Sequence, residues 1–288
     1  MEFLEFANEI AAFIKERGNY ETRIGVVDKN DGIKLTGIIL GDSQKVQPVI
    51  DLEDYYNKFL RGTPMEILAD YIEKFYETIR YDENMEFFED YGKVENRIYI
   101  RLINYEKNEE LLMRVPHIRW HDLAAVFYYP MEWTEERVTI LLYENHLKLW
   151  GKTVEEIFQT AKRNMERDIP VRLITLEEIV HEVTGKEHQE ERPSIYVLTI
   201  PGNQDGAAAI LYASEIKELA DKLQSDLLLF PSSIHEFLIV EDNHERTYEY
   251  DRMTVHLVNE REVYFQEFLS ESLYRYNREK DEIEIILE

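Results

Sequence analysis

The chain contains no cysteine, and this absence excludes several classes of protein. Disulfide scaffolds, iron–sulfur proteins, cysteine nucleophiles and thiolate-ligated zinc sites all need a side chain that is missing here. Long hydrophobic runs are missing as well. The longest candidates, Leu123–Tyr129 and Ala207–Ala213, fall far short of the roughly 18–20 residues that span a bilayer, and both are typical of buried strands.

Basic charge is also scarce. The 288 residues include 33 Lys and Arg against 59 Asp and Glu, which gives a formal net charge of −26. Such a field repels phosphate backbones and anionic lipids, and the longest basic clusters are pairs such as Lys162-Arg163. We therefore expect no direct binding to nucleic acid or to a membrane, which leaves another protein as the macromolecular partner. The charge either keeps a solvated surface soluble or mimics a polyanion in a partner's basic groove.

The chain does contain enough apolar side chains for a core. Hydrophobic residues make up 44% and aromatic residues 12% of the sequence, which excludes a fully disordered chain. The first residues, Met1-Glu2-Phe3-Leu4-Glu5, are acidic where a signal peptide would be basic. Together with the lack of cysteine, this start favours a cytoplasmic location.

Helical and strand periodicities are mixed along the chain without a strict strand–helix–strand rhythm. This mixture predicts an α+β fold with mixed or antiparallel sheets, packed helices and two subdomains. Two capping boxes, Thr153 with Glu156 and Thr175 with Glu178, predict helix starts. The charged, apolar-free stretch 186–193 (KEHQEERP) predicts a linker between residues 1–185 and 194–288, with the two α+β regions packed together as one unit.

Motifs for cofactors and metals are incomplete. Gly151-Lys152-Thr153 resembles the end of a phosphate loop, but His146 occupies the position where that loop needs a glycine. We therefore expect no bound cofactor. His117 and His121 are four residues apart beside Asp122, a spacing that would let them share a metal on a helix, but Pro116 favours an extended start. The sequence thus predicts packing there and no metal site.

A second local constellation lies in Pro231–Glu236 (PSSIHE). Ser233, His235 and Glu236 offer a hydroxyl, an imidazole and a carboxylate, the three groups of a nucleophilic hydrolase. In such enzymes these groups usually converge from distant segments. A run of this kind more often forms a capped turn between strands, and both interpretations stay open.

Several segments considered together resemble a known family. In chain order they are Leu35–Leu40 (LTGIIL), Tyr55-Tyr56, Arg101–Leu112 (RLINYEKNEELL), Val115–Tyr129 (VPHIRWHDLAAVFYY), Asn145–Gly151 (NHLKLWG), Gly206–Tyr212 (GAAAILY) and Pro231–Glu236 (PSSIHE). The chain resembles an uncharacterised bacterial family of anaerobic Gram-positive organisms, catalogued as domain of unknown function 5688. Pieces around Leu123–Asn164 and after Ala207 resemble, more weakly, a second uncharacterised family, domain of unknown function 1444. These resemblances imply one integrated fold and a bacterial cytosolic setting, but no catalytic residue.

The candidate pocket residues all lie in these segments. They are His117, Asp122, His146, Ser233, His235 and Glu236. They could converge on one pocket beside Tyr128 and Trp150, or they could be polar groups satisfied in or beside a core. The second interpretation is favoured, because polar groups in such segments more often settle structure than perform chemistry.

Three functions remain open. The leading one is a non-enzymatic, acidic interaction protein, with a polyanion mimic as its narrower form. The alternative is a hydrolase-type or metal-dependent enzyme that uses His235 with Glu236, or a cluster of His117, Asp122 and His146, with side chains about 3–5 Å apart in a concave pocket. The third is a small-molecule binding domain lined by some of the 19 tyrosines.

Overall fold

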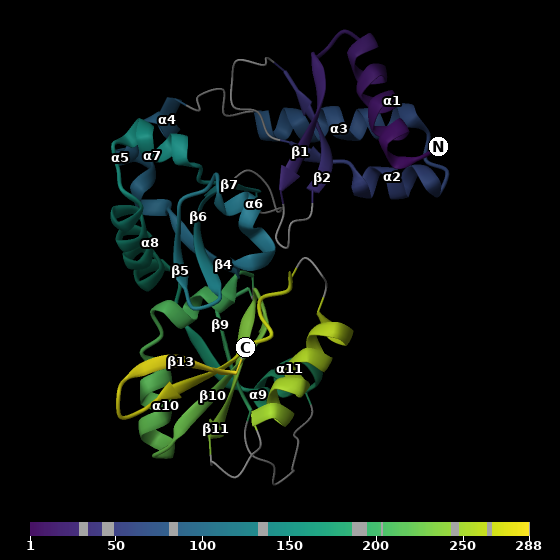
Figure 1. Cartoon of the computed structure of the whole chain (residues 1–288). Coiled ribbons are helices and arrows are strands. Elements are labelled where there is room, and N and C mark those ends of the chain that lie inside the picture. The colour runs from purple at the N-terminus through teal and green to yellow at the C-terminus, as the bar shows by residue number, and fades with distance from the viewer. Residues whose placement is uncertain are drawn as a thin grey trace. The chain divides into compact units, whose positions relative to one another are not determined.

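The computed structural model divides the chain into two compact units (Figure 1). Unit 1 comprises Met1–Asp90 and Pro130–Thr139, and unit 2 comprises Tyr91–Tyr129 and Ile140–Glu288. The described residues are 1–28, 34–41, 49–80, 86–131, 138–185, 195–202, 204–242, 248–263 and 267–287. The predicted linker at 186–193 lies outside them, so the predicted boundary between residues 185 and 194 stays a prediction.

Unit 1 packs helices on a three-stranded antiparallel sheet of order β1-β2-β3. Its elements are α1 (Phe3–Glu16), β1 (Thr22–Asp28), β2 (Lys34–Leu40), β3 (Ile50–Asp51), α2 (Glu53–Leu60), α3 (Met65–Arg80) and α4 (Glu86–Glu89). Helix α1 buries Phe6, Ile10 and Ile14, which recur at helical spacing. Its far end is tied to α3 by Arg17, whose guanidinium lies 2.5 Å from Asp70 and 2.8 Å from Glu73.

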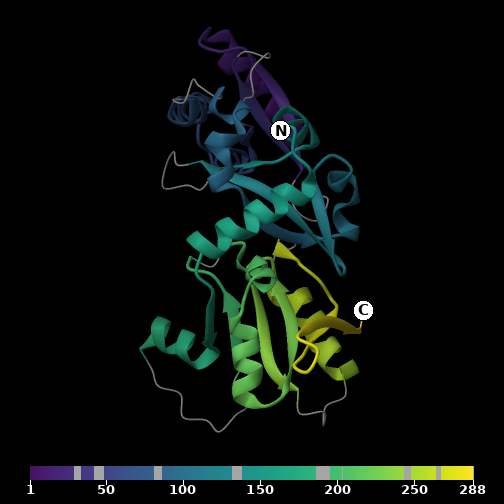
Figure 2. The ribbon, with the colours of Figure 1, turned by 90° about the vertical axis from the view of Figure 1, so that its left-hand side faces the viewer.

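Unit 2 contains two sheets. The first has the order β4-β6-β5, with β7 on β6, and the second has the order β13-β12-β10-β11-β9-β8 (Figure 2). The strands are β4 (Tyr99–Asn104), β5 (His117–Trp120), β6 (Leu123–Met131), β7 (Val138–Leu141), β8 (Arg172–Thr175), β9 (Tyr196–Thr199), β10 (Asp226–Ser233), β11 (Glu236–Asp242), β12 (Leu273–Asn277) and β13 (Glu282–Leu287). The pairings described between them are antiparallel, so the predicted α+β class is confirmed.

Unit 2 contains α-helices and short 3₁₀ helices, and side-chain caps begin two of the α-helices. They are α5 (Tyr91–Val94), α6 (Glu109–Leu112), α7 (Glu144–Trp150), α8 (Val154–Asp168), α9 (Leu176–Thr184), α10 (Glu215–Leu223) and α11 (Tyr248–Glu262), with the 3₁₀ helices η2 (Glu95–Arg97), η3 (Glu106–Asn108) and η4 (Gly206–Leu211). Both predicted capping boxes, at Thr153 and Thr175, are confirmed. In the first, bonds from the backbone and hydroxyl of Thr153 hold the pKa of Glu156 below its usual range.

Of the two long apolar runs, one forms a strand and the other forms a 3₁₀ helix. Leu123–Tyr129 forms the buried strand β6, as predicted. The run that begins at Ala207 is not a strand, because Gly206–Leu211 forms the 3₁₀ helix η4, packed against β4, β9 and β11. The residues from Gly206 to Ala209 are small enough to be buried in this tight helix. A short apolar run carries no period that separates a strand from a buried helix. Within the described residues, every helix is too short or too polar to traverse a bilayer.

Candidate functional site

Asp122 lies in the turn between β5 and β6 and accepts hydrogen bonds from three hydroxyl groups. Its Oδ2 is 2.5 Å from the Ser270 Oγ and 3.0 Å from the Ser272 Oγ, and its Oδ1 accepts from the Tyr274 hydroxyl. Tyr274 is fully buried, and both burial and the neighbouring carboxylate raise its pKa far above the ordinary value. The phenol therefore stays protonated and donates. We call these four side chains the Asp122 cluster; it joins the first sheet of unit 2 to the start of β12.

Aromatic rings surround the Asp122 cluster. Trp120 stacks on Tyr274 with ring centroids 5.6 Å apart, and His121, with φ of +54°, places its ring 4.5 Å from Trp120. His117 has other surroundings, with Nδ1 3.0 Å from the Val115 carbonyl oxygen and its ring against Tyr105. Within the described residues, no group of three or more His, Asp or Glu side chains could hold a metal ion.

His146 lies in the first turn of α7. Its Nδ1 accepts a bond from the Tyr143 backbone N–H at 3.0 Å, and its ring stacks on Trp150 at 5.9 Å. Because burial disfavours the charged imidazolium, the pKa of His146 is lowered. His117 and Asp122 share Tyr105 as a neighbour, because the Tyr105 backbone N–H donates to the Asp122 carbonyl oxygen at 2.9 Å. The contacts described for His146 are with Tyr143 and Trp150.

Ser233, His235 and Glu236 meet at the turn between β10 and β11, but not as a catalytic chain. The Ser233 hydroxyl accepts a bond from the backbone N–H of His235 at 3.1 Å, as in a capped turn. The His235 Nδ1 accepts from the backbone N–H of Asp205 at 3.1 Å, and its Nε2 lies 3.4 Å from Glu267. An imidazole whose Nδ1 accepts one backbone bond is held in one orientation, and here its described partners do not include the Ser233 hydroxyl.

No sequence pattern indicates the ion pair beside this turn. Arg101 on β4 binds Asp205 through two bonds, Nε to Oδ1 at 2.7 Å and Nη2 to Oδ2 at 2.8 Å, and its guanidinium lies over the Tyr128 ring at 5.1 Å. Such planar, bidentate pairs fix geometry as well as charge. Asp205 therefore joins the first sheet, through Arg101, to the turn that carries His235. Its partner lies 104 residues away, so no local motif could reveal the pair.

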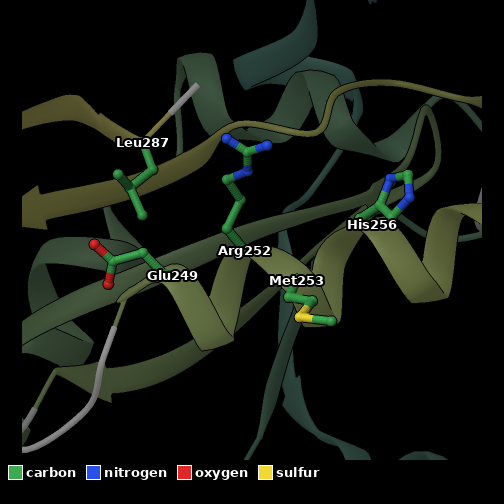
Figure 3. Close-up of a pocket in the computed structure, with 5 residues that line it drawn as sticks. All are labelled: Glu249, Arg252, Met253, His256 and Leu287. Atoms are coloured by element: carbon green, nitrogen blue, oxygen red, sulfur yellow. The ribbon is translucent and has the colours of Figure 1, made fainter.

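A shallow groove lies elsewhere in unit 2, between α11 and the end of β13 (Figure 3). Its volume is about 310 Å³. The lining residues are Glu249, Arg252, Met253, His256 and Leu287, none of which the sequence analysis singled out. His256 is oriented by Glu271, whose Oε1 lies 2.9 Å from its Nδ1. The predicted site residues and the groove are therefore separate features of the unit.

Glu236 gives a pH-dependent test of a structural role. Burial raises its pKa above the ordinary value near 4.5, although the Ser232 hydroxyl and His235 oppose the shift. The folded protein then holds the carboxyl proton more tightly than the unfolded chain, so its contribution to stability is lost as pH rises from 4.5 through the raised pKa. We expect Glu236→Gln to stabilise the fold at pH 7 by up to about 1 kcal/mol and to change little near pH 4. Thermal unfolding at both pH values checks this. A difference from the wild type that does not vary with pH contradicts it.

Comparisons with known proteins place the chain in one family. The sequence model of a family described as "Family of unknown function (DUF5688)" matches residues 3–278, which is nearly the whole chain. No curated protein and no solved structure matches the chain.

Proposed function

We propose that this chain, which belongs to the family of unknown function DUF5688, is a non-enzymatic interaction protein that binds a basic partner protein. The observation that carries the proposal is the distribution of charge over the fold. Unit 1 has 23 acidic and 11 basic residues, a net charge of −12, and unit 2 has 36 acidic and 22 basic residues, a net charge of −14. Each unit alone therefore attracts cationic surfaces.

Local pairing occupies many of the basic side chains and leaves the net charge of each unit unchanged. Ion pairs with carboxylates of the same unit hold Lys15, Arg17, Arg101, Lys152, Arg167, Arg172, Lys217, Arg275, Arg278 and Lys280. Exposed carboxylates remain in surplus. On α1, for example, Glu5, Glu9 and Glu16 are exposed and follow one another at intervals of four and seven residues, which places them on one face of the helix.

The candidate catalytic groups support the same proposal. The Asp122 carboxylate accepts three hydroxyl bonds, and the His235 imidazole is engaged by Asp205 and faces Glu267. These contacts stabilise the fold. The enzyme alternative needs a bond between the Ser233 hydroxyl and the His235 imidazole, and the contacts described for that imidazole are with other groups. The narrower form, a polyanion mimic, predicts a regular array of carboxylates on one face.

The proposal predicts salt-sensitive capture of a basic protein. The full chain, immobilised, is mixed with an extract of the organism that encodes it at about 0.05 M salt and washed at about 0.5 M, where screening shortens the range of surface charges to about 4 Å. We expect one or a few proteins of basic isoelectric point to be retained at low salt and released at high salt.

The control is an unrelated folded protein of similar mass and net charge. If it retains the same proteins in the same amounts, the capture reflects charge alone and the proposed function is wrong. Capture of partners that are neutral or acidic, or that stay bound at high salt, also contradicts it.

A further inference from the structure

We infer that the β13 edge of the six-stranded sheet, together with the groove beside α11, binds an extended basic segment of the partner protein. This inference rests on the proposed function and gives it a location. We call the combined surface the β13–α11 surface; it consists of Glu282–Leu287 with Glu249, Arg252, Met253 and His256.

The first observation is an open sheet edge. β13 pairs with β12 along one side, and the sheet formed by the described residues ends at β13. The backbone groups on the outer side of an edge strand are a template for one more strand, which is how many proteins bind extended peptides. From Ile283 to Leu287 the strand is apolar at four of five positions and only half-buried, so an added strand would remove apolar surface from water.

The second observation is the groove, because Leu287 belongs both to β13 and to the wall of the groove (Figure 3). A strand added beside β13 would therefore lie against this wall and could direct alternate side chains toward it. Met253, whose exposed fraction is 61%, offers an apolar and adaptable contact. Glu249 offers an exposed carboxylate in the same groove.

Charge decides which strand fits. Glu282 is exposed on β13, and the groove contains one carboxylate, Glu249, and one guanidinium, Arg252. Because unit 2 as a whole has a net charge of −14, a complementary strand carries basic side chains, opposite Glu282 and Glu249, among apolar ones. A second copy of this chain fits poorly, since it would bring another net charge of −26 to the edge. The third carboxylate, Glu284, is already bound by Arg275, whose hydrogen bond lowers its pKa. The occupant is therefore an extended basic segment of a different protein.

The test uses the full chain and a fluorescent eight-residue peptide, blocked at both ends, that alternates lysine and valine. Binding is measured by anisotropy at about 0.1 M salt. Met253→Lys adds a like charge and removes the apolar contact, so we expect it to weaken binding at least about tenfold. The matched control is Met113→Lys, which makes the same change at a methionine that is 76% exposed and lies outside the groove; we expect a change of less than about threefold.

Three further readouts identify the mode of binding. A peptide with alternate backbone amides methylated has lost the donors of one edge, and we expect it to bind at least about tenfold more weakly. Equal binding of that peptide overturns strand addition, and equal weakening by the two methionine variants overturns the location. A dimer in sedimentation experiments that Met253→Lys abolishes would assign the surface to self-association instead.

A decalysine peptide separates this inference from the proposed function. If decalysine binds as tightly as the alternating peptide and Met253→Lys leaves both unchanged, the β13–α11 surface is not the site. The proposed function survives that result when the extract experiment still yields a salt-sensitive basic partner, and falls when it does not.

Discussion

Replacing Asp122 with alanine is expected to lower the free energy of unfolding of unit 2 by about 3–5 kcal/mol, because it leaves three hydroxyl groups without their acceptor. Ser270 and Ser272 are buried and Tyr274 is fully buried, so water cannot readily replace the carboxylate. Each buried donor that loses its partner costs about 1–3 kcal/mol. The substitution also frees the β5–β6 turn from the segment that enters β12.

Urea denaturation followed by tryptophan fluorescence checks this expectation, since Trp120 stacks on Tyr274 within the cluster. Tyr274→Phe and Ser272→Ala each remove one donor and should cost about 1 kcal/mol. The matched control is Asp221→Ala, which removes an exposed carboxylate bonded to Arg278 and should cost less than about 1 kcal/mol. An effect of Asp122→Ala no larger than that of Asp221→Ala would refute a central structural role.

Adding one methyl group at Gly206 is expected to destabilise unit 2 by about 2–3 kcal/mol. A Cβ at this position would lie 2.4 Å from the His235 carbonyl oxygen and 2.4 Å from the Thr199 Oγ1, which is far inside van der Waals contact. Thr199 donates to the same carbonyl oxygen at 2.9 Å, so the crowded atoms form the bond that holds β9 to the turn after β10. Gly206→Ala must displace η4 or break this bond.

Two variants separate crowding from other effects at Gly206. Gly151→Ala is the matched control, because Gly151 has φ of +63° with open space around it, so only backbone strain of about 1–2 kcal/mol applies. The double variant Gly206→Ala with Thr199→Ala removes one of the two close contacts and should recover part of the loss beyond that of Thr199→Ala alone. Equal effects of Gly206→Ala and Gly151→Ala in calorimetry would show that the site relaxes freely.

Local patterns in the sequence predicted the parts of the fold that local physics determines. The capping boxes at Thr153 and Thr175 need residues only three positions apart, and both are present. The hairpin of β12 and β13 is likewise a local structure, because each strand pairs with its neighbour in the sequence. The strand predicted from Ala207 was wrong, because the choice of η4 depends on the packing of β4, β9 and β11 around it.

The candidate site depends on contacts that no local pattern predicts. Asp122 and His235 stand out in the sequence as polar groups, but no pattern indicates their partners. The hydroxyls that bond to Asp122 belong to residues 148 to 152 positions further along the chain. No local pattern indicates the groove, for a related reason. It depends on where α11 meets the end of β13, and residues such as Met253 and Leu287 look ordinary in the sequence.

The Asp122 cluster also orders events during biosynthesis. A ribosome releases the β5–β6 turn long before it releases Ser270, Ser272 and Tyr274, so a nascent chain carries the carboxylate without its first donor until 148 further residues have been added. Contacts of such long sequence separation form late and slow the folding reaction. Unit 2 can therefore mature only after residues 270–274 have left the ribosome, and chaperones that act on nascent chains would meet it in an incomplete state.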